Sequence, residues 1–343
     1  MSAAGTDLQR VLATFLPRYR HEHALHPRQR QVCAHIRDCR TAALGGLVEG
    51  CERCEYQSPP RFNSCRDRHC PKCQGRAAAQ WGERQRERLL PVTYYHLVFT
   101  VPDALNPWGQ LCPRVLYTQL FASAWATLSA FAANPRRLGG QLGATLVLHT
   151  WGRTLIQHVH LHCLVPGGVL TAAGEWCPAK GAYLFPVRAL SRRFRGHFVA
   201  GLRRRQRAGE LGRLDPEAVD GMLDALMATD WVVYAKSCLG HTESVVAYLA
   251  RYTHRTALSD QRLIGIEGER VGLRYTDHRD GQRKALWLDA TELIRRFLLH
   301  VLPKGLMRIR HYGFLANRCR SERLRQIRDA LHARRRRPRE PPR

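Results

Sequence analysis

The chain has 343 residues, 44% of them hydrophobic, which is enough to bury a sizeable core. Its 55 Lys and Arg residues outnumber its 28 Asp and Glu residues, and the resulting charge of +27 indicates a nucleic-acid partner. No apolar run approaches the ~20 residues of a membrane helix, and the first residues lack a signal-peptide pattern, so we expect a soluble cytoplasmic protein with no membrane partner.

The first part of the chain is basic and rich in cysteine. Residues 7–40 have helical spacing and many Arg and His residues, which predicts a basic helical lead-in. Seven of the 12 cysteines lie between Cys33 and Cys73. Because this long chain shows no sign of secretion, the cluster indicates metal binding rather than a disulfide framework.

Two Cys-x-x-Cys pairs in this cluster have the spacing of a zinc site. Cys51 and Cys54 form one pair, Cys70 and Cys73 form the other, and 15 residues separate them. Four thiolates could hold one tetrahedral zinc ion, which would be structural because so short and polar a segment cannot form a core by itself. Neighbouring residues would suffice for a second zinc ion, although Cys65 could equally be a core residue: Cys39, Cys65, His69 and His35.

The next segments alternate between helix and strand patterns. A charged helix is expected over residues 81–90, a strand over 94–101, a helix with an apolar stripe over 114–133 and a strand over 144–150. A short turn joins the last of these to the following strand, which favours antiparallel pairing.

The stretch that follows, residues 157–168, is expected to be a strand that ends at a turn, and it carries three histidines at alternate positions, so all three lie on one face. A single histidine here would be read as a satisfied core residue, but three in register favour a metal. Residues two apart are about 6.6 Å from each other along a strand and can reach one ion, whereas His158 and His162 lie about twice as far apart. The strand therefore supplies two ligands, and the others come from elsewhere.

The second half of the chain continues this mixed pattern. Strands are expected over residues 183–187, 231–235, 262–266, 270–276 and 284–288, and helices over 188–207, 216–228 and 290–301. The helix 188–207 is so strongly basic that it suggests a track for DNA phosphates. The arginines expected to bind DNA are Arg192, Arg193, Arg203 and Arg204 on this helix, and Arg308 and Arg310 further on.

Residues 244–257 predict a helix with two tyrosines. Tyr248 and Tyr252 are four residues apart and project from the same side, with Arg251 and Arg255 flanking them. Tyrosines at this spacing are ordinarily packing residues, and the histidine strand is what favours a catalytic interpretation.

These groups support one chemical hypothesis. A divalent ion would polarise a phosphodiester, and a tyrosine oxygen would attack phosphorus and leave the strand covalently attached. Arginine would offset the charge of the transition state. The chain has no Gly-x-x-x-x-Gly-Lys-Ser/Thr loop, so we expect no nucleotide hydrolysis.

At these residues the chain resembles the rolling-circle transposases of bacterial insertion sequences, which belong to the His-hydrophobic-His single-strand endonucleases. The resemblance covers most of the chain. Its motifs are Cys39-Arg-Thr-Ala-Ala-Leu-Gly-Gly, Asn63-Ser-Cys-Arg-Asp-Arg-His-Cys-Pro-Lys-Cys-Gln74, His149-Thr-Trp-Gly, His160-Leu-His162, Tyr248-Leu-Ala-Arg-Tyr-Thr-His-Arg255, His300-Val-Leu-Pro and Arg308-Ile-Arg-His-Tyr-Gly313.

The resemblance implies a role for each motif. His160 and His162 would hold a catalytic Mg²⁺ or Mn²⁺ ion, and Tyr248 and Tyr252 would be the nucleophiles. The third protein ligand would be His149 or His158, with His254 less favoured.

The resemblance also implies a fold and an activity. We expect an α+β fold with an antiparallel sheet, divided into a zinc-binding domain over residues 1–90, a catalytic domain over 91–317 and a basic, disordered tail over 318–343. The protein would nick and transfer single-stranded DNA at transposon ends through a 5′-phosphotyrosine intermediate in the bacterial cytoplasm. No helicase module is present, so a host helicase would separate the strands.

Two other functions remain open at this point. One is a zinc-dependent DNA-binding protein without catalysis. The other is a transposase that uses two metal ions and clustered carboxylates, for which Asp230, Asp277 and Glu292 are the candidates. The sequence makes no prediction of the oligomeric state.

Overall fold

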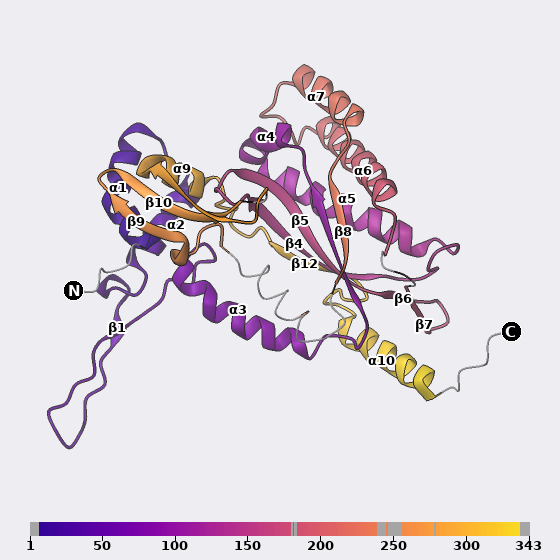
Figure 1. The fold of residues 1–343 in the computed structure, drawn as a ribbon, viewed down its shortest axis with the longest axis horizontal. Coiled ribbons are helices and arrows are strands. Elements are labelled where there is room, and N and C mark those ends of the chain that lie inside the picture. Colours follow the sequence, from indigo (N-terminus) through magenta and orange to yellow (C-terminus); the bar gives the residue numbers. More distant parts are fainter. Residues whose placement is uncertain are drawn as a thin grey trace. The chain divides into compact units, whose positions relative to one another are not determined.

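The computed structural model describes residues 7–179, 181, 184–238, 245, 256–277 and 279–336. They form a mixed α+β fold with antiparallel sheets, which confirms the predicted fold class. The chain divides into two compact units of interleaved segments (Figure 1). The cysteine unit comprises Met1–Trp81, Thr150–Gln157 and His254–Lys304, and the histidine unit comprises Gly82–His149, His158–Thr253 and Gly305–Arg343.

The cysteine unit packs three helices against a three-stranded antiparallel sheet. The helices are α1 (Leu8–Glu22), α2 (Pro27–Asp38) and α9 (Ala290–Leu298). The sheet has the order β11-β10-β9, with η3 (Asp260–Arg262) before β9 (Leu263–Glu267), β10 (Arg270–Thr276) and β11 (Arg283–Asp289). Apolar residues from all these helices and strands are buried in one shared core.

Local sequence accounts for the start of two helices of this unit, α1 and α9. The Asp7 carboxylate accepts a hydrogen bond from the backbone N–H of Arg10 at 2.8 Å, and Asp289 accepts one from Thr291 at 2.8 Å. Each aspartate thus satisfies a backbone donor that the first turn leaves open. The buried residues of α9 recur at helical spacing: Ala290, Leu293, Ile294, Phe297 and Leu298.

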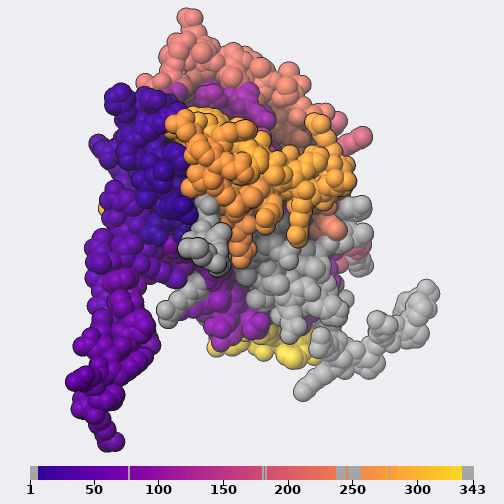
Figure 2. Space-filling model, turned by 60° about the vertical axis from the view of Figure 1, so that its left-hand side comes forward, coloured from indigo at the N-terminus to yellow at the C-terminus, as the bar shows by residue number. Residues whose placement is uncertain are grey.

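A slender arm, residues 46–62, extends from the cysteine unit (Figures 1 and 2). β1 (Gly46–Leu47) pairs with β2 (Arg61–Phe62) at its base, after η1 (Ala42–Leu44) and before α3 (Pro71–Arg86). Several large apolar side chains of the arm are exposed: Leu47, Val48, Tyr56 and Phe62. Backbone pairing at the base, and not a hydrophobic core, therefore holds the arm.

The histidine unit is built on a five-stranded sheet with the order β12-β4-β5-β3-β8. The strands are β3 (Tyr94–Thr100), β4 (Gly143–Trp151), β5 (Gln157–Pro166), β8 (Val233–Cys238) and β12 (Ile309–Gly313). β3 pairs antiparallel with β5 and β8, and β12 pairs antiparallel with β4. The histidine strand β5 is therefore central.

Helices cover one face of this sheet. α5 (Pro113–Ala133) and α6 (Val187–Arg207) pack on it, with Phe99 of β3 against Phe194 of α6, and Tyr312 of β12 stacked on Trp125 of α5. Because successive side chains of a strand point to opposite faces, the other face carries the histidines. We call it the histidine face, and its residues include His96, His149, His160, His162 and His311.

Shorter elements complete the histidine unit. η2 (Asp103–Leu105), α4 (Asn106–Leu111) and α7 (Pro216–Ala228) are helical, and β6 (Gly168–Leu170) pairs with β7 (Trp176–Pro178). α10 (Arg320–Arg336) packs through a small core that includes Leu90, Trp176 and Phe314. Among the described residues, no helix is both long and apolar enough to cross a membrane.

Three of the differences between the structure and the expected elements have a clear physical reason. The charged helix begins at Pro71 and not near residue 81, since proline suits the first turn of a helix. Residues 184–186 form no strand, and α6 starts directly after Pro186. Residues 320–336, expected to be a disordered tail, form α10 because buried Leu324 and Ile327 give it an apolar face.

The units also cut across the predicted domain boundaries. Those boundaries, after residues 90 and 317, followed the chain, whereas each unit combines segments that are distant in sequence. Most of the helix predicted over 244–257 lies outside the described residues.

Candidate metal centres and DNA-contacting residues

Three histidines meet on the histidine face. His149 of β4 and His160 and His162 of β5 offer ligand nitrogens that all lie within 4.8 Å of one another. The Nε2 atoms of His160 and His162 are 3.1 Å apart, and the rings of His149 and His162 are 4.5 Å apart. His149 and His160 are buried, and His162 is partly exposed, so the cluster faces a route to solvent.

Hydrogen bonds orient two of these rings. His160 Nδ1 lies 2.9 Å from the carbonyl oxygen of His158, so this nitrogen donates and leaves the Nε2 lone pair for the cluster. His162 Nδ1 lies 2.9 Å from Nε2 of His96 on β3. Burial, and then the charge of His160, lowers the pKa of His96 to about 4, so His96 is neutral near pH 7.

His96 is a site residue that the sequence analysis did not single out. It lies on the same face as His162, because Val98 pairs with His162 across the β3–β5 ladder. The available signal was a histidine in a predicted strand of apolar residues, two positions before Val98 and therefore on the same face. That signal by itself favours an ordinary core histidine.

His149, and not His158, joins the histidine pair. His158 lies on the same face, but its Nδ1 is 3.9 Å from Asp103 and its side chain is 42% exposed. Its ligand atoms are not in the cluster formed by His149, His160 and His162. His149 lies on the neighbouring strand and is therefore closer to His162 than His158 is, because four residues of β5 separate His158 from His162.

The expected nucleophiles and their arginines cannot be placed on this face from the structure. Tyr248, Arg251, Tyr252 and Arg255 lie outside the described residues, as does His254.

Four cysteines form a second cluster, in the cysteine unit. The sulfur atoms of Cys39, Cys65, Cys70 and Cys73 lie within 4.8 Å of one another, with Cys73 3.6 Å from Cys39 and 3.7 Å from Cys65. Cys39 follows α2, whereas Cys70 and Cys73 flank the start of α3. A partly buried group of four thiols fits tetrahedral zinc, and the positive end of a helix favours thiolates.

The cysteine cluster favours one thiolate, that of Cys65, while the neighbouring thiols are protonated. A hydrogen bond from Cys70, opposed by burial and aided by the Asp67 backbone, lowers the pKa of Cys65 to about 5. Burial raises the pKa of Cys39 to about 11. The neighbouring thiols therefore donate hydrogen bonds to the sulfur of Cys65. A bound cation would take the place of their protons.

The grouping differs from the two Cys-x-x-Cys pairs expected to join. Cys70 and Cys73 lie with Cys39 and Cys65, while Cys51 and Cys54 are exposed on the arm. The reason is the closed base of the arm, where Gly46 pairs with Phe62 and the Arg40 amide donates to Asn63. This pairing brings the residues on either side of the arm together and leaves the Cys51 pair beyond them.

The histidines considered for a second zinc ion bind an aspartate instead. His69 Nδ1 lies 2.8 Å and His35 Nδ1 lies 3.0 Å from the buried Asp67 carboxylate. Nε2 of His69 accepts from the backbone N–H of Leu302. Burial would raise the pKa of Asp67, but the hydrogen bonds of His69 and His35 hold it well below its usual range.

The arginines expected to bind DNA fall into two groups. Arg192, Arg193 and Arg204 are exposed on α6, and Arg203 is paired with Asp224 of α7. In contrast, Arg310 packs its guanidinium over the Phe121 ring at 4.2 Å, on the helix-covered face of the sheet. Arg308, two residues before Arg310, is partly buried.

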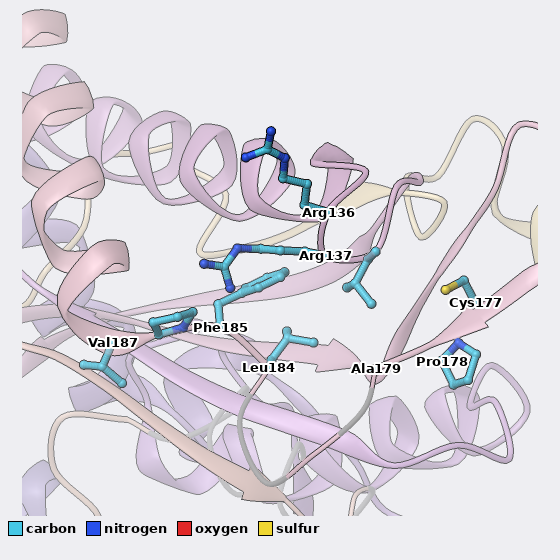
Figure 3. A pocket seen from close by; sticks show the side chains of 10 residues that line it. Arg136, Arg137, Cys177, Pro178, Ala179, Leu184, Phe185 and Val187 are labelled. Carbon is cyan, nitrogen blue, oxygen red and sulfur yellow. The ribbon is translucent and has the colours of Figure 1, made fainter.

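An open pocket of about 700 Å³ lies elsewhere in the histidine unit (Figure 3). Arg136 and Arg137 border it on one side, and Cys177 and Pro178 of β7 border it on another. None of its lining residues is a candidate from the sequence analysis. It is therefore not the histidine site.

The carboxylates of the two-metal alternative are not gathered by the structure. Within the described part of the chain they belong to neither cluster of potential metal ligands. Asp230 lies beside Arg195, Asp277 beside Lys284, and Glu292 between Arg295 and Arg296. Each is thus the partner of a cation.

Comparison with known proteins gives two family matches. Residues 143–323 match the protein family described as "Putative transposase", and residues 11–101 match the family described as "Transposase zinc-binding domain". The two matches together take in the histidine cluster and the cysteine cluster.

Two curated proteins are similar over most of this chain. "Putative transposase y4qJ" of Sinorhizobium fredii (strain NBRC 101917 / NGR234) is 43% identical over 341 residues, which cover 96% of this chain and 85% of that protein. "Transposase for insertion sequence element IS801" of Pseudomonas savastanoi pv. phaseolicola is 30% identical over 281 residues, covering 78% of this chain and 65% of that protein. No solved structure matches.

Proposed function

Because the chain belongs to the IS91-type rolling-circle transposases and carries their zinc-binding domain, we propose that it cuts and joins single-stranded DNA at its histidine face. The observation that carries this proposal is the convergence of His149, His160 and His162 within 4.8 Å. Family membership makes the protein a DNA transposase, and the site chemistry below is our proposal.

We assign the catalytic ion to these three histidines. Their donor set is three imidazoles with one partly exposed side, and it leaves coordination positions for oxygen atoms of a phosphodiester. When bound, Mg²⁺ or Mn²⁺ would polarise that phosphodiester and offset the charge that develops on its oxygens. The His158 carbonyl and His96 hold the His160 and His162 rings in place for this role.

The nucleophile would be Tyr248 or Tyr252, as the resemblance implies. The phenol oxygen forms a bond to phosphorus while the bond from phosphorus to the 3′ oxygen breaks, and the 3′ oxygen takes up a proton. The products are a 5′-phosphotyrosine and a free 3′-hydroxyl. Attack by the 3′-hydroxyl of another strand reverses these steps and joins the strands, and Arg251 and Arg255 would offset the added charge.

Zinc belongs to the structural part of the protein. We propose Cys39, Cys65, Cys70 and Cys73 as its ligands, because their sulfur atoms are already grouped around one point. In this proposal Cys51 and Cys54 do not bind the zinc ion. The remaining partners follow from the chemistry: single-stranded transposon ends as substrate and a host helicase to expose them, in the cytoplasm of a bacterium.

A covalent-adduct assay tests the proposal. Purified protein, labelled single-stranded DNA of a transposon end and Mn²⁺ should give an adduct that survives denaturation. The Tyr248→Phe, Tyr252→Phe double variant should give none, and mass spectrometry should place the adduct on one of these tyrosines. An adduct of unchanged yield in the double variant would exclude them as nucleophiles.

The same assay separates the catalytic function from DNA binding alone. A non-catalytic zinc protein would bind the DNA with strong salt dependence, yet would give no adduct with either ion. His160→Ala and His162→Ala are expected to abolish the adduct while DNA binding persists.

A further inference from the structure

A second, smaller pocket opens on the histidine face of the same unit. On the measure that gives about 700 Å³ for the pocket in Figure 3, its volume is about 20 Å³, and it lies between the end of α3, the sheet and the start of α10. Its lining residues are Gln85, Arg88, Leu89, Tyr94, Thr145, Leu164, His311, Leu315 and Arg320. None of the basic ones was a candidate in the sequence analysis.

The charges around this pocket are all of one sign. Neither Arg88 nor Arg320 has a carboxylate partner within 4.0 Å among the described residues, and the Arg320 guanidinium donates to the side-chain oxygen of Asn317, at 2.8 Å. Burial, and then the charge of Arg88, lowers the pKa of Arg320. Two guanidinium groups that repel each other at this pocket favour an anion between them.

A buried donor points to the same ligand class. The Gln85 side chain is only 6% exposed, and its Nε2 group has no hydrogen-bond partner among the residues that the structure describes. An unpaired buried amide is costly, so in native proteins such a group usually has a bound ligand, an ion or an ordered water as its partner. The hydroxyl of Thr145 and the ring of His311, 2.9 Å apart, add further polar atoms at the pocket wall.

The sheet register fixes where this pocket lies relative to the histidine cluster. Leu164 follows His162 by two residues on β5, and Thr145 precedes His149 by four on β4, so both lie on the histidine face. At about 3.3 Å per residue, the pocket is about 7 to 13 Å from the cluster along the strands. A DNA strand advances ~3.4 Å per nucleotide when stacked and further when extended, so about one to four nucleotides span this distance.

We propose that Gln85, Arg88 and Arg320 bind a backbone phosphate of the DNA strand, one to four nucleotides from the phosphate held at the histidine cluster. The assignment rests on the proposed function, because it takes the strand at the cluster to be the ligand. The chemistry recognised is a phosphate group, which a free phosphate ion could also supply. A contact of this kind sets the register of the strand without reading its bases.

A phosphate walk tests the proposal on the full-length protein. Single methylphosphonate linkages, which are neutral, are placed in turn at the four positions on each side of the cleavage site. Dissociation constants are measured without divalent ion, so no cleavage is needed. One position should weaken binding to the wild-type protein about tenfold and to Arg320→Gln less than about twofold, because the variant has already lost that contact.

Arg318→Gln is the matched control, since Arg318 is exposed and lies two residues away. It should keep the position-specific loss. The salt dependence gives a second measure: with Arg320→Gln, the slope of log affinity against log salt should fall by about 0.7. If every position has the same effect on wild type and Arg320→Gln, the pocket binds no DNA phosphate.

Gln85→Met keeps the proposal testable should Arg320→Gln fold poorly. Removing an unsatisfied buried amide should raise the melting temperature of the free protein by about 2 to 4 °C, yet remove the same position-specific contact. A purely structural glutamine would show a lower melting temperature and unchanged binding, which would overturn the assignment.

Two further results distinguish binding of a DNA phosphate from binding of a free phosphate ion, and failure of this inference from failure of the proposed function. If inorganic phosphate at constant ionic strength raises the melting temperature of wild type but not of Arg320→Gln, and the walk shows no special position, the ligand is a free ion and the DNA assignment fails. If the walk shows the position but no covalent adduct ever forms, the pocket stands and the proposed function fails.

Discussion

His160 and His162 are two residues apart on β5 and present their Nε2 atoms to each other at 3.1 Å. A hydrogen bond between these nitrogens uses one N–H, whereas a divalent ion can accept both lone pairs. His149 reaches the same point from β4. The pair can therefore hold the cation that we propose, and the groups that contact the two rings would decide how tightly the cation binds.

His96 should matter more to metal binding than His158. Because His96 lies 2.9 Å from His162 Nδ1, His96→Ala should weaken Mn²⁺ binding about 10- to 100-fold, as measured by calorimetry. His158→Ala should change it less than about threefold, since that side chain is 42% exposed and the hydrogen bond to His160 comes from the backbone oxygen of His158, which the variant keeps. An equal or greater loss in His158→Ala would contradict the ligand set, and melting curves check that both variants fold.

Zinc content should follow the cysteine cluster and not the sequence pairs. Cys39→Ser and Cys65→Ser should lose most of the bound zinc and unfold at lower temperature, because each removes a ligand of the grouped four. Cys51→Ser and Cys54→Ser, both on the exposed arm, should keep it. Zinc released by a thiol reagent gives the stoichiometry, and loss of zinc in Cys51→Ser would refute the grouping.

His300 should make the cysteine unit sensitive to acid. Burial lowers its pKa to about 4, and its Nε2–H donates to the carbonyl of Leu155 at 3.0 Å. The unfolded chain therefore binds the proton more readily between pH 6.5 and 4, so this stability is complete above 6.5 and is lost as pH falls.

The loss should amount to about 3 kcal/mol across that window. Urea unfolding at pH 7 and pH 4 measures it, and His300→Gln should reduce the difference between the two pH values by that amount. His158→Gln serves as the control, because the side chain is exposed. A His300→Gln curve parallel to the wild-type curve would show that His300 is not the acid-sensitive group.

Arg192 and Arg310 should behave differently when each loses its charge. Arg192→Gln, on the exposed side of α6, should lower the salt dependence of single-strand binding by about 0.7 in slope and leave stability unchanged if α6 follows the phosphates. Arg310→Gln should instead cost about 1 kcal/mol of unfolding free energy, because its guanidinium packs on Phe121 at 4.2 Å. Binding titrations at several salt concentrations and urea unfolding separate the two effects.

Much of the fold could be predicted because it depends on local periodicity. Strand alternation alone placed His160 and His162 on one face, and helical spacing predicted α5 and α6 to within one residue at each end. The cysteine spacing predicted zinc, and the match to a zinc-binding domain supports it. The predicted disorder at residues 320–336 was wrong, because a local excess of arginine concealed the spacing of Leu324 and Ile327.

Which residues meet across the fold could be decided only by the tertiary structure. His149 and His96 join the histidine pair because β4 and β3 flank β5. The alternation of residues within one strand does not predict the order of strands in a sheet. Cys39 and Cys65 join Cys70 and Cys73 because the arm closes at its base, which leaves the better-spaced Cys51 pair outside. Sequence spacing governs neighbours along the backbone, whereas a metal site or a phosphate pocket depends on distances that chain folding sets.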